Sequence, residues 1–284
     1  MKVYITGASG RLGRILRAAW SDSGKLGFDP IWCCRQPKNR TDARWDILSD
    51  PMPAISRGAV IIHLAGIVRG DEFALAANSQ MALKVCDVAR LAGAAHVFLA
   101  SSAAVYGVGL TDHVEVQAPA PVSDYGRAKL TVERDALCWA HKIGRSAPGI
   151  SCLRIGNVLG ADALFGGNRQ MRKVVLDAVA GQSGGPRRSY IGPREFANVL
   201  AGLVQMVATG VTLPRVLNIA AAGTVAMGDL LDAADQPYCL GQSDADVIPR
   251  VGLSTKRLSG LMPVHPANVN SLWADFKSLK EFAL

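Results

Sequence analysis

The sequence has no long apolar run, no block of like charge and no Cys-x-x-Cys pair. No apolar stretch approaches the roughly 18 residues that a membrane-spanning helix needs, so we expect no membrane partner. No run of five or more Lys and Arg residues suggests a tail that binds nucleic acid. The 31 Lys and Arg residues still exceed the 23 Asp and Glu residues, and this net charge of +8 favours an anionic small-molecule ligand.

The cysteines indicate a reducing compartment and no metal site. None of the six forms a Cys-x-x-Cys pair or has metal-ligand spacing with the five histidines. Reduced, buried thiols in a cytoplasmic protein explain all of them. A strand begins within two residues of the amino terminus, so we expect no signal peptide. The cysteines are Cys33, Cys34, Cys86, Cys138, Cys152 and Cys239.

A glycine-rich turn lies close to the amino terminus. The β-rich run 2–6 leads directly into Gly7-Ala8-Ser9-Gly10-Arg11-Leu12-Gly13, and residues 11–20 have the apolar spacing of a helix. A strand, a glycine turn and a helix in this order are typical of dinucleotide binding, because glycine lets the backbone approach a pyrophosphate at the helix amino end. The spacing is G-x-x-G-x-x-G, and a purely structural turn is the alternative.

The second expected strand bears on the choice of cofactor. It covers residues 30–34 and is followed by Arg35, and no acidic residue lies between positions 31 and 40. An acidic residue at this point binds the ribose 2′-hydroxyl of NAD, whereas an arginine accommodates the 2′-phosphate of NADP. Lys38, Arg40, Arg11 and Arg14 could reach the same phosphate. The sequence therefore favours NADP over NAD, with a solvated basic loop as the alternative.

Strands alternate with helices over the first 155 residues. The runs 59–66 and 96–100 are mostly apolar, as in parallel strands buried on both faces, 150–155 is another expected strand, and 72–92 is helical by pattern. We predict a Rossmann-like, doubly wound parallel α/β sheet with a smaller C-terminal substrate lobe. The NAD(P)-binding domain would span 1–160, with 193–222 returning to it, and the lobe would span 161–284.

The second half has a looser pattern. We expect a helix over 169–181, a helix over 194–209 and a strand over 217–220. The remainder, from residue 229 to the end, indicates only short helices and turns.

Tyr125 and Lys129 are the strongest candidates for chemistry. At positions i and i+4 of a helix they lie on one face, and a nearby cation favours the phenolate form of a tyrosine, which lowers its pKa. Such a group suits acid–base chemistry at an alcohol or carbonyl. Ser102 ends a buried strand and can face the same cleft, whereas His63 is expected to be a core histidine. Chance spacing of the tyrosine and lysine is the alternative.

The motifs together resemble the extended short-chain dehydrogenase/reductases, the NAD-dependent epimerase/dehydratase family. Asp46-Ile47 matches that family's adenine-contacting pair, and Leu253-Ser-Thr-Lys-Arg-Leu258 is similar to a late family motif. The remaining motifs occur in the family's order: Gly7-x-x-Gly10-x-x-Gly13, His63-Leu-Ala-Gly66, Asn78, Ser101-Ser102-Ala-Ala-Val-Tyr-Gly107, Tyr125-x-x-x-Lys129, Arg154-x-x-Asn157-Val158 and Arg188-Ser-Tyr-Ile191.

The resemblance implies a role for each matched residue. Tyr125 would be the acid/base, Lys129 would lower its pKa and bind the nicotinamide ribose, and Ser102 would bind the reacting oxygen. The substrate would contact Ser102, Asn157, Arg188 and Tyr190. The NADP or NAD cofactor would contact Gly7, Ser9, Gly10, Arg11, Leu12, Gly13, Arg35, Asp46, Ile47, Leu64, Ala65, Gly66, Asn78, Tyr125, Lys129 and Ile155.

Two departures from the family pattern limit the expected function. The family's His-Val-Asp-Asp is Gly192-Pro193-Arg194-Glu195 here, which leaves the ordinary nucleotide-sugar site open. Ser102-Ala103-Ala104 replaces the Thr-Asp-Glu of sugar dehydratases, which argues against elimination of water. The sequence thus predicts hydride transfer at a carbinol or carbonyl carbon.

Three functions remain open at this level. The first is an epimerase acting on a nucleotide sugar, and the second is an NADPH-dependent reductase of a small carbonyl compound. The third is a non-catalytic NADP-sensing protein, against which the complete set of Ser102, Tyr125 and Lys129 argues. The resemblance also implies a homodimer that pairs through helices corresponding to 72–92 and 126–142.

Overall fold

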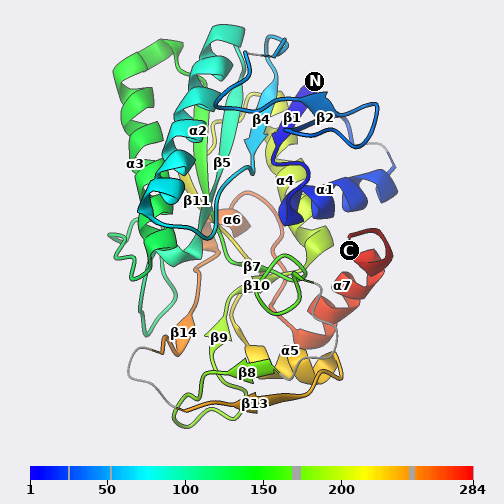
Figure 1. Cartoon of the computed structure of the whole chain (residues 1–284), viewed down its shortest axis with the longest axis vertical. Helices are drawn as coiled ribbons and strands as arrows, with labels where there is room; N and C mark the ends of the chain where they lie inside the picture. Colours follow the sequence, from blue (N-terminus) through cyan, green and yellow to red (C-terminus); the bar gives the residue numbers. More distant parts are fainter. Residues whose placement is uncertain (25, 52, 168–173, 243–246, 284) are drawn as a thin grey trace.

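A seven-stranded parallel sheet forms the centre of the molecule. The computed structural model describes residues 1–24, 26–51, 53–167, 174–242 and 247–283. The strand order is β11-β6-β5-β4-β1-β2-β3, so the chain changes direction across the sheet beside β1 (Figure 1). This is the predicted doubly wound α/β fold. The strands are β1 (Lys2–Thr6), β2 (Asp29–Cys34), β3 (Ala43–Arg44), β4 (Val60–His63), β5 (His96–Ser102), β6 (Gly149–Ile155) and β11 (Val216–Ile219).

Helices cover both faces of this sheet. On one face α2 (Glu72–Ala92) packs beside α3 (Asp124–Ile143), and on the other α1 (Arg11–Asp22) packs beside α4 (Pro193–Ala208) (Figure 1). All four residues of β4 are buried, which explains its unbroken apolar sequence. A short 3₁₀ turn, η1 (Ala103–Val105), follows β5, and another, η2 (Gly144–Ser146), follows α3.

The second half builds small sheets of its own below the main one (Figure 1). These pair β7 with β10, β8 with β13, and β9 with both β12 and β14. The long helix α7 packs against α1 and α4 and so ties this region to the main sheet. The elements are β7 (Asn157–Val158), β8 (Val174–Leu176), β9 (Arg187–Arg188), β10 (Tyr190–Ile191), β12 (Val225–Ala226), α5 (Met227–Ala233), β13 (Tyr238–Leu240), β14 (Arg250–Val251), α6 (Lys256–Ser259) and α7 (Val269–Ala283).

Two expectations for the second half are wrong. The predicted helix 169–181 is not formed over its described part, because Val174–Leu176 is a strand paired with β13 and residues 177–181 are not helical. Positions 169–173 lie outside the described residues. The final segment also contains more than short helices and turns, since α7 has 15 residues. Leu272, Phe276 and Leu279 recur at helical spacing along it and are buried.

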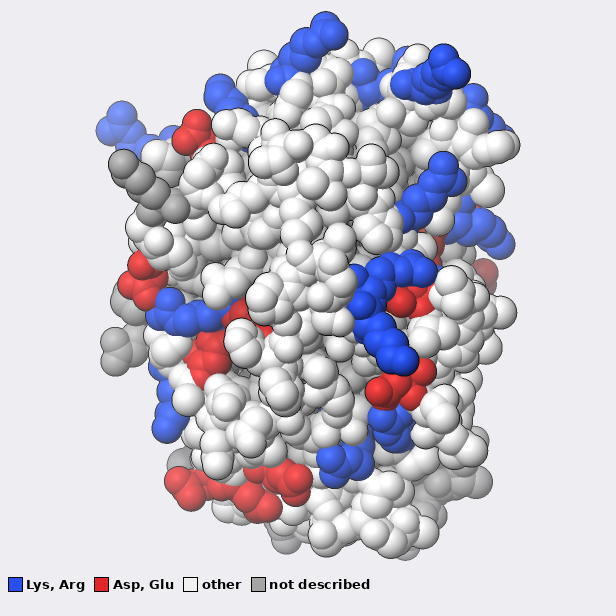
Figure 2. Space-filling view, turned by 180° about the vertical axis from the view of Figure 1, so that it is seen from behind, with Lys and Arg blue, Asp and Glu red and all other residues white. Residues whose placement is uncertain are grey.

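The surface carries its charges in a dispersed way. On the face shown in Figure 2, Lys and Arg side chains lie singly or in small groups, with Asp and Glu among them and a broad uncharged area at the centre. Within the described parts of the chain, no helix is long and apolar enough to cross a membrane.

Candidate active site

The glycine turn between β1 and α1 leaves room for a ligand's phosphates. Gly7 has a φ of +71°, and a Cβ there would lie 2.5 Å from the Ala65 nitrogen. A Cβ at Gly13 would lie 2.5 Å from the Gly7 oxygen, so both positions require glycine. Gly10 caps α1 without any side-chain hydrogen bond, which leaves the first amides of the helix free for an anion. The turn therefore fits the pyrophosphate of a dinucleotide.

A cavity of about 790 Å³ opens at the carboxyl ends of the strands, next to this turn. Ligands of doubly wound sheets bind at this position. Arg69 and residues of the loop 161–167, which the sequence did not single out as ligand contacts, also line it. The predicted residues that line it are Gly7, Gly10, Arg11, Leu12, Gly13, Leu64, Gly66, Ser102, Tyr125, Lys129, Ile155 and Asn157.

The end of β5 contacts the face of α3 that carries Tyr125 and Lys129. The Lys129 ammonium donates a 2.8 Å hydrogen bond to the Ala100 carbonyl, and the Tyr125 side chain hydrogen-bonds the Ser102 side chain. Ser102 also accepts a 3.2 Å hydrogen bond from the Ala104 amide. Residues four apart lie on one face of a helix, so Tyr125 and Lys129 both contact the end of β5, at Ser102 and Ala100.

The pKa of Tyr125 does not follow the sequence prediction. Burial raises the pKa of this phenol above its usual value, and the hydrogen bond with Ser102 offsets only part of the rise. The Lys129 nitrogen lies 5.9 Å from the centre of the Tyr125 ring and is directed to the Ala100 carbonyl. The lysine alone therefore does not activate the tyrosine.

Lys129 is itself strongly perturbed. Burial lowers the pKa of its ammonium group to about 8, while Glu133 and Cys152 act in the opposite direction. A Cβ at Gly66 would lie 3.4 Å from the Lys129 nitrogen, which places the amine against the turn that follows β4. The site thus contains a lysine whose charge is present at neutral pH and is lost in mild alkali.

Asn78 and His63 lie near the cavity without lining it. The Asn78 amide exchanges two hydrogen bonds with the Ile67 backbone, at 2.7 and 2.9 Å, which explains an asparagine inside a helix. His63 is fully buried, its Nδ1 lies 2.8 Å from the Thr6 hydroxyl, and burial followed by the Lys129 charge lowers its pKa to about 3. His63 is therefore the neutral core histidine that the sequence predicted.

Several predicted ligand contacts lie away from this cavity. Ile47 is buried in the core between the sheet and α2, and the Asp46 amide bonds the Asp50 side chain at 2.7 Å. Tyr190 is fully buried, donates to Asp162 at 3.1 Å and does not line the cavity. Arg188 donates to the Arg187 carbonyl at 2.9 Å and does not line the cavity. For Ile47 and Tyr190 the deciding contacts are with residues distant in the chain, which the local motif could not show.

A second cavity, of about 540 Å³, lies beside the end of β2. Ser9, Arg14 and Lys38 line it, while the exposed Arg35 stands next to its Cys34 wall. Asp42, a buried acid two residues beyond the stretch 31–40, also lines this cavity. The Asp42 carboxylate is paired with Arg17 at 2.8 Å and also accepts from Asn39 at 3.3 Å. The acid is therefore already bonded within the protein.

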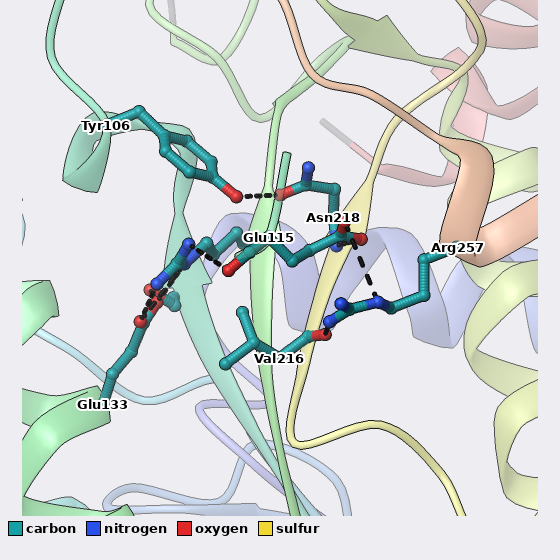
Figure 3. Close-up of polar contacts among 8 residues, drawn as sticks. Tyr106, Glu115, Glu133, Val216, Asn218 and Arg257 are labelled. Carbon is teal, nitrogen blue, oxygen red and sulfur yellow. Dashed lines mark hydrogen bonds and ion pairs between the residues drawn. The ribbon is translucent and has the colours of Figure 1, made fainter. Parts of the chain in front are cut away.

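A buried polar network extends from α3 to the second half of the chain (Figure 3). Glu133 lies one turn beyond Lys129, and Arg154 binds its carboxylate through two nitrogens, with its Nη2 at 2.7 Å. From there the network reaches Tyr106, which donates to Asn218 at 2.7 Å (Figure 3). Glu133 was not singled out in the sequence, although its place four residues after Lys129, in the i, i+4, i+8 spacing that begins at Tyr125, could have indicated it.

The Gly192 departure has a structural explanation. Asp275 of α7 accepts from the amides of Arg194 and Glu195, at 3.1 and 3.2 Å, and so caps the start of α4. A Cβ at Gly192 would lie 2.0 Å from the Asp275 carboxylate. A distant acid thus supplies the cap that the local sequence lacks.

The fold and the glycine turn define a dinucleotide-binding α/β protein of the Rossmann type. A sequence model of the family described as "NAD dependent epimerase/dehydratase family" matches residues 3–220. The chain belongs to this family. The resemblance seen in the sequence, and the class of NAD-dependent enzyme that it implied, are therefore confirmed.

Solved structures of similar fold extend over the whole chain. MoeE5 in complex with UDP-glucuronic acid and NAD is 20% identical with a TM-score of 0.75, and the match covers 100% of each chain. UDP-glucose-4-epimerase from Stenotrophomonas maltophila, with bound NAD and formylated UDP-arabinopyranose, is 17% identical with a TM-score of 0.79, over 99% of this chain and 98% of that one. At these identities the likeness shows the fold. A search among curated protein sequences finds no match.

Proposed function

We propose that this protein catalyses NAD(P)-dependent hydride transfer at a carbinol or carbonyl carbon of a nucleotide sugar. The observation that carries the proposal is the arrangement at the end of β5, where Ser102 meets Tyr125 and Ala100 meets Lys129. Ser102, Tyr125 and Lys129 line one cavity together with the glycine turn. Similar folds that hold UDP sugars and NAD support the substrate class.

The residues present fit a nicotinamide dinucleotide. Gly7, Gly10 and Gly13 would hold its pyrophosphate, and Lys129 would hold the ribose nearest the reacting end. When bound, the cofactor supplies hydride acceptance or donation, and its oxidised ring carries a positive charge that favours a phenolate. Because burial raises the pKa of Tyr125, that added charge is needed for the tyrosine to act as a base.

Tyr125 and Ser102 would handle the proton of the reacting oxygen. In the oxidative direction the Tyr125 oxygen takes the proton of the substrate hydroxyl, and in the reductive direction it returns it. Ser102 holds the same oxygen in place by a hydrogen bond. Asn157 lines the cavity and would bind the sugar, whereas Arg188 and Tyr190 support the surrounding loops.

NADP is the proposed cofactor. Arg14, Lys38 and Ser9 surround the second cavity, and Arg35 stands at its edge, where a 2′-phosphate would lie. Asp42 would favour NAD if its carboxylate were free, but Arg17 and Asn39 occupy it. This observation favours the second candidate function, an NADPH-dependent reductase of a small carbonyl compound, because a reductase consumes NADPH from solution.

A panel of nucleotide sugars and small carbonyl compounds separates the two functions. We expect an epimerase to interconvert sugar isomers, followed by NMR, with no net change in cofactor. A reductase would instead consume NADPH in proportion to product. If the purified chain bound neither NADPH nor NADH, both functions would be contradicted. The homodimer and the cytoplasmic location stay predictions, which light scattering and cell fractionation would test.

A further inference from the structure

Three consecutive residues at the end of β5 contact three residues of α3 that are four positions apart. Ala100 accepts from Lys129, Ser102 bonds Tyr125, and between them the Ser101 hydroxyl donates to Glu133 Oε1. The function proposed above uses the first two contacts. The third involves a carboxylate that is fully buried, with 2% exposure, and that reaches no ligand cavity.

Glu133 is held in place by a strong ion pair. Arg154 Nε lies 3.0 Å from one carboxylate oxygen and its Nη2 lies 2.7 Å from the other, and both side chains are at most 5% exposed. Burial alone would lower the pKa of Arg154, but the hydrogen bonds and charge of Glu133 raise it instead. In the register of β5 and β6, Arg154 is the neighbour of Ser101. The carboxylate is therefore fixed from both strands.

Glu133 lies one helical turn beyond Lys129 on the same face of α3, both side chains are buried, and among the groups that act on Lys129 it is the anionic one. His63 on β4 is neutral, because burial and Lys129 lower its pKa to about 3. Burial raises the pKa of the Cys152 thiol on β6 well above its usual value, and burial also raises that of Tyr125 on α3. A buried ammonium needs an opposite charge to stay protonated.

We propose that Glu133, clamped by Arg154 and Ser101, is the positioning residue that keeps Lys129 charged and directed toward the cofactor at neutral pH. This inference rests on the proposed function, in which the Lys129 ammonium holds the cofactor ribose. Glu133 acts through Lys129 and touches no ligand itself. Its role differs from that of a general stabilising ion pair, because it sets the charge of another group.

The test is a titration of the free protein labelled with [ε-¹³C]lysine, with the Lys129 signal assigned by its loss in Lys129→Gln. Glu133→Gln should lower the Lys129 midpoint by about one pH unit, the lower end of the shift that an adjacent opposite charge causes. Arg154→Gln frees the carboxylate and should raise the midpoint. Glu115→Gln is the matched control: Glu115 is also buried in this network but bonds Asn218, and it should leave the midpoint unchanged.

A lower Lys129 midpoint in Glu133→Gln and a higher one in Arg154→Gln support the proposal, because a merely structural role would move both midpoints in one direction. Shifts of the same sign, or no shift in Glu133→Gln, would overturn it. If the glutamine variants do not fold, Glu133→Asp keeps the charge but withdraws the carboxylate by one methylene. A lower midpoint in that variant supports the proposal, and an unchanged one overturns it. The titration needs neither cofactor nor substrate, so its outcome is independent of whether the proposed reaction is correct.

Discussion

The first 160 residues and the rest of the chain reach their structure by different means. The first region builds six adjacent parallel strands, whose pairs are joined by regular backbone hydrogen bonds. In the described part of the second region, only β11 joins that sheet, and the other strands have two or three residues. Side chains from distant segments hold it instead, as Asp275 holds α4 and Asn218 holds the backbone at Ser254.

This difference explains which half of the site could be read from the sequence. The order of strand, glycines and helix and the i, i+4 spacing of Tyr125 and Lys129 are local patterns, so the sequence suffices to find them. Their contacts in the fold, such as that of Gly7 with Ala65, are with residues far along the chain. The substrate side depends on contacts between residues far apart in the chain. Tyr190, for example, fits a family motif, yet its hydroxyl bonds Asp162 within the protein.

Acid should affect the sheet of the first region most. Burial lowers the pKa of His63 to about 3 and that of His96 to about 4, so both stay neutral when folded but take up protons when unfolded. Their contribution is complete above pH 6.5, and it is lost as the pH falls toward 4. The expected loss in the free energy of unfolding is on the order of 5 kcal/mol. Urea unfolding at pH 7 and pH 4.5 measures it, and a loss that does not shrink in His96→Asn would contradict this account of His96.

Gly7 and Gly24 together test how much the close packing of the glycine turn matters to stability. Gly7 and Gly24 share a φ of +71°, but a Cβ at Gly7 meets backbone at 2.5 Å, whereas a Cβ at Gly24 has nothing within 4 Å. Gly7→Ala should cost about 2–5 kcal/mol from backbone strain plus overpacking and should abolish cofactor binding. Gly24→Ala should cost only about 1–2 kcal/mol. Thermal unfolding compares them, and equal losses would show that the close packing at Gly7 is unimportant.

The cap that Asp275 of α7 provides for α4 tests whether contacts between distant residues stabilise the second region. Asp275→Ala removes both acceptors at the start of α4 and should destabilise the protein by about 1–2 kcal/mol, with cofactor affinity unchanged. Ser278→Ala removes two exposed hydrogen bonds, one accepted from Arg194 and one donated to the Asp275 carbonyl, and should cost no more than about 0.5 kcal/mol. Chemical denaturation measures both changes. An Asp275→Ala protein as stable as the wild type would mean that α4 needs no cap from α7.

Arg11 provides the smallest expected effect. Its exposed guanidinium reaches from α1 to the carbonyls of Ala161 and Asp162, at 3.2 and 3.3 Å. Loss of these hydrogen bonds in Arg11→Ala should cost at most about 1 kcal/mol. A larger loss by thermal unfolding would show that this contact, and not the helices α4 and α7, joins the two regions.

The separation along the chain between interacting residues decided which elements the sequence could predict. The helix 72–92 was placed with its ends because Asp71 and Gly93 cap it locally, and β1 was placed because Gly7 ends it. The helix expected over 169–181 failed, because pairing with β13 some 60 residues later selects a strand at Val174–Leu176. The raised pKa of Tyr125 was missed for the same reason, since burial is a property of the assembled fold.

The most direct test of the proposed function is the rate of hydride transfer in Tyr125→Phe. With a substrate that the wild-type protein turns over, the variant should bind the cofactor with the same affinity, because the Lys129 and glycine-turn contacts remain. Its rate of cofactor reduction or oxidation should fall by about 10²–10⁴-fold, the usual contribution of a general acid or base. A variant that binds cofactor normally and still transfers hydride at the wild-type rate would contradict the assignment of Tyr125.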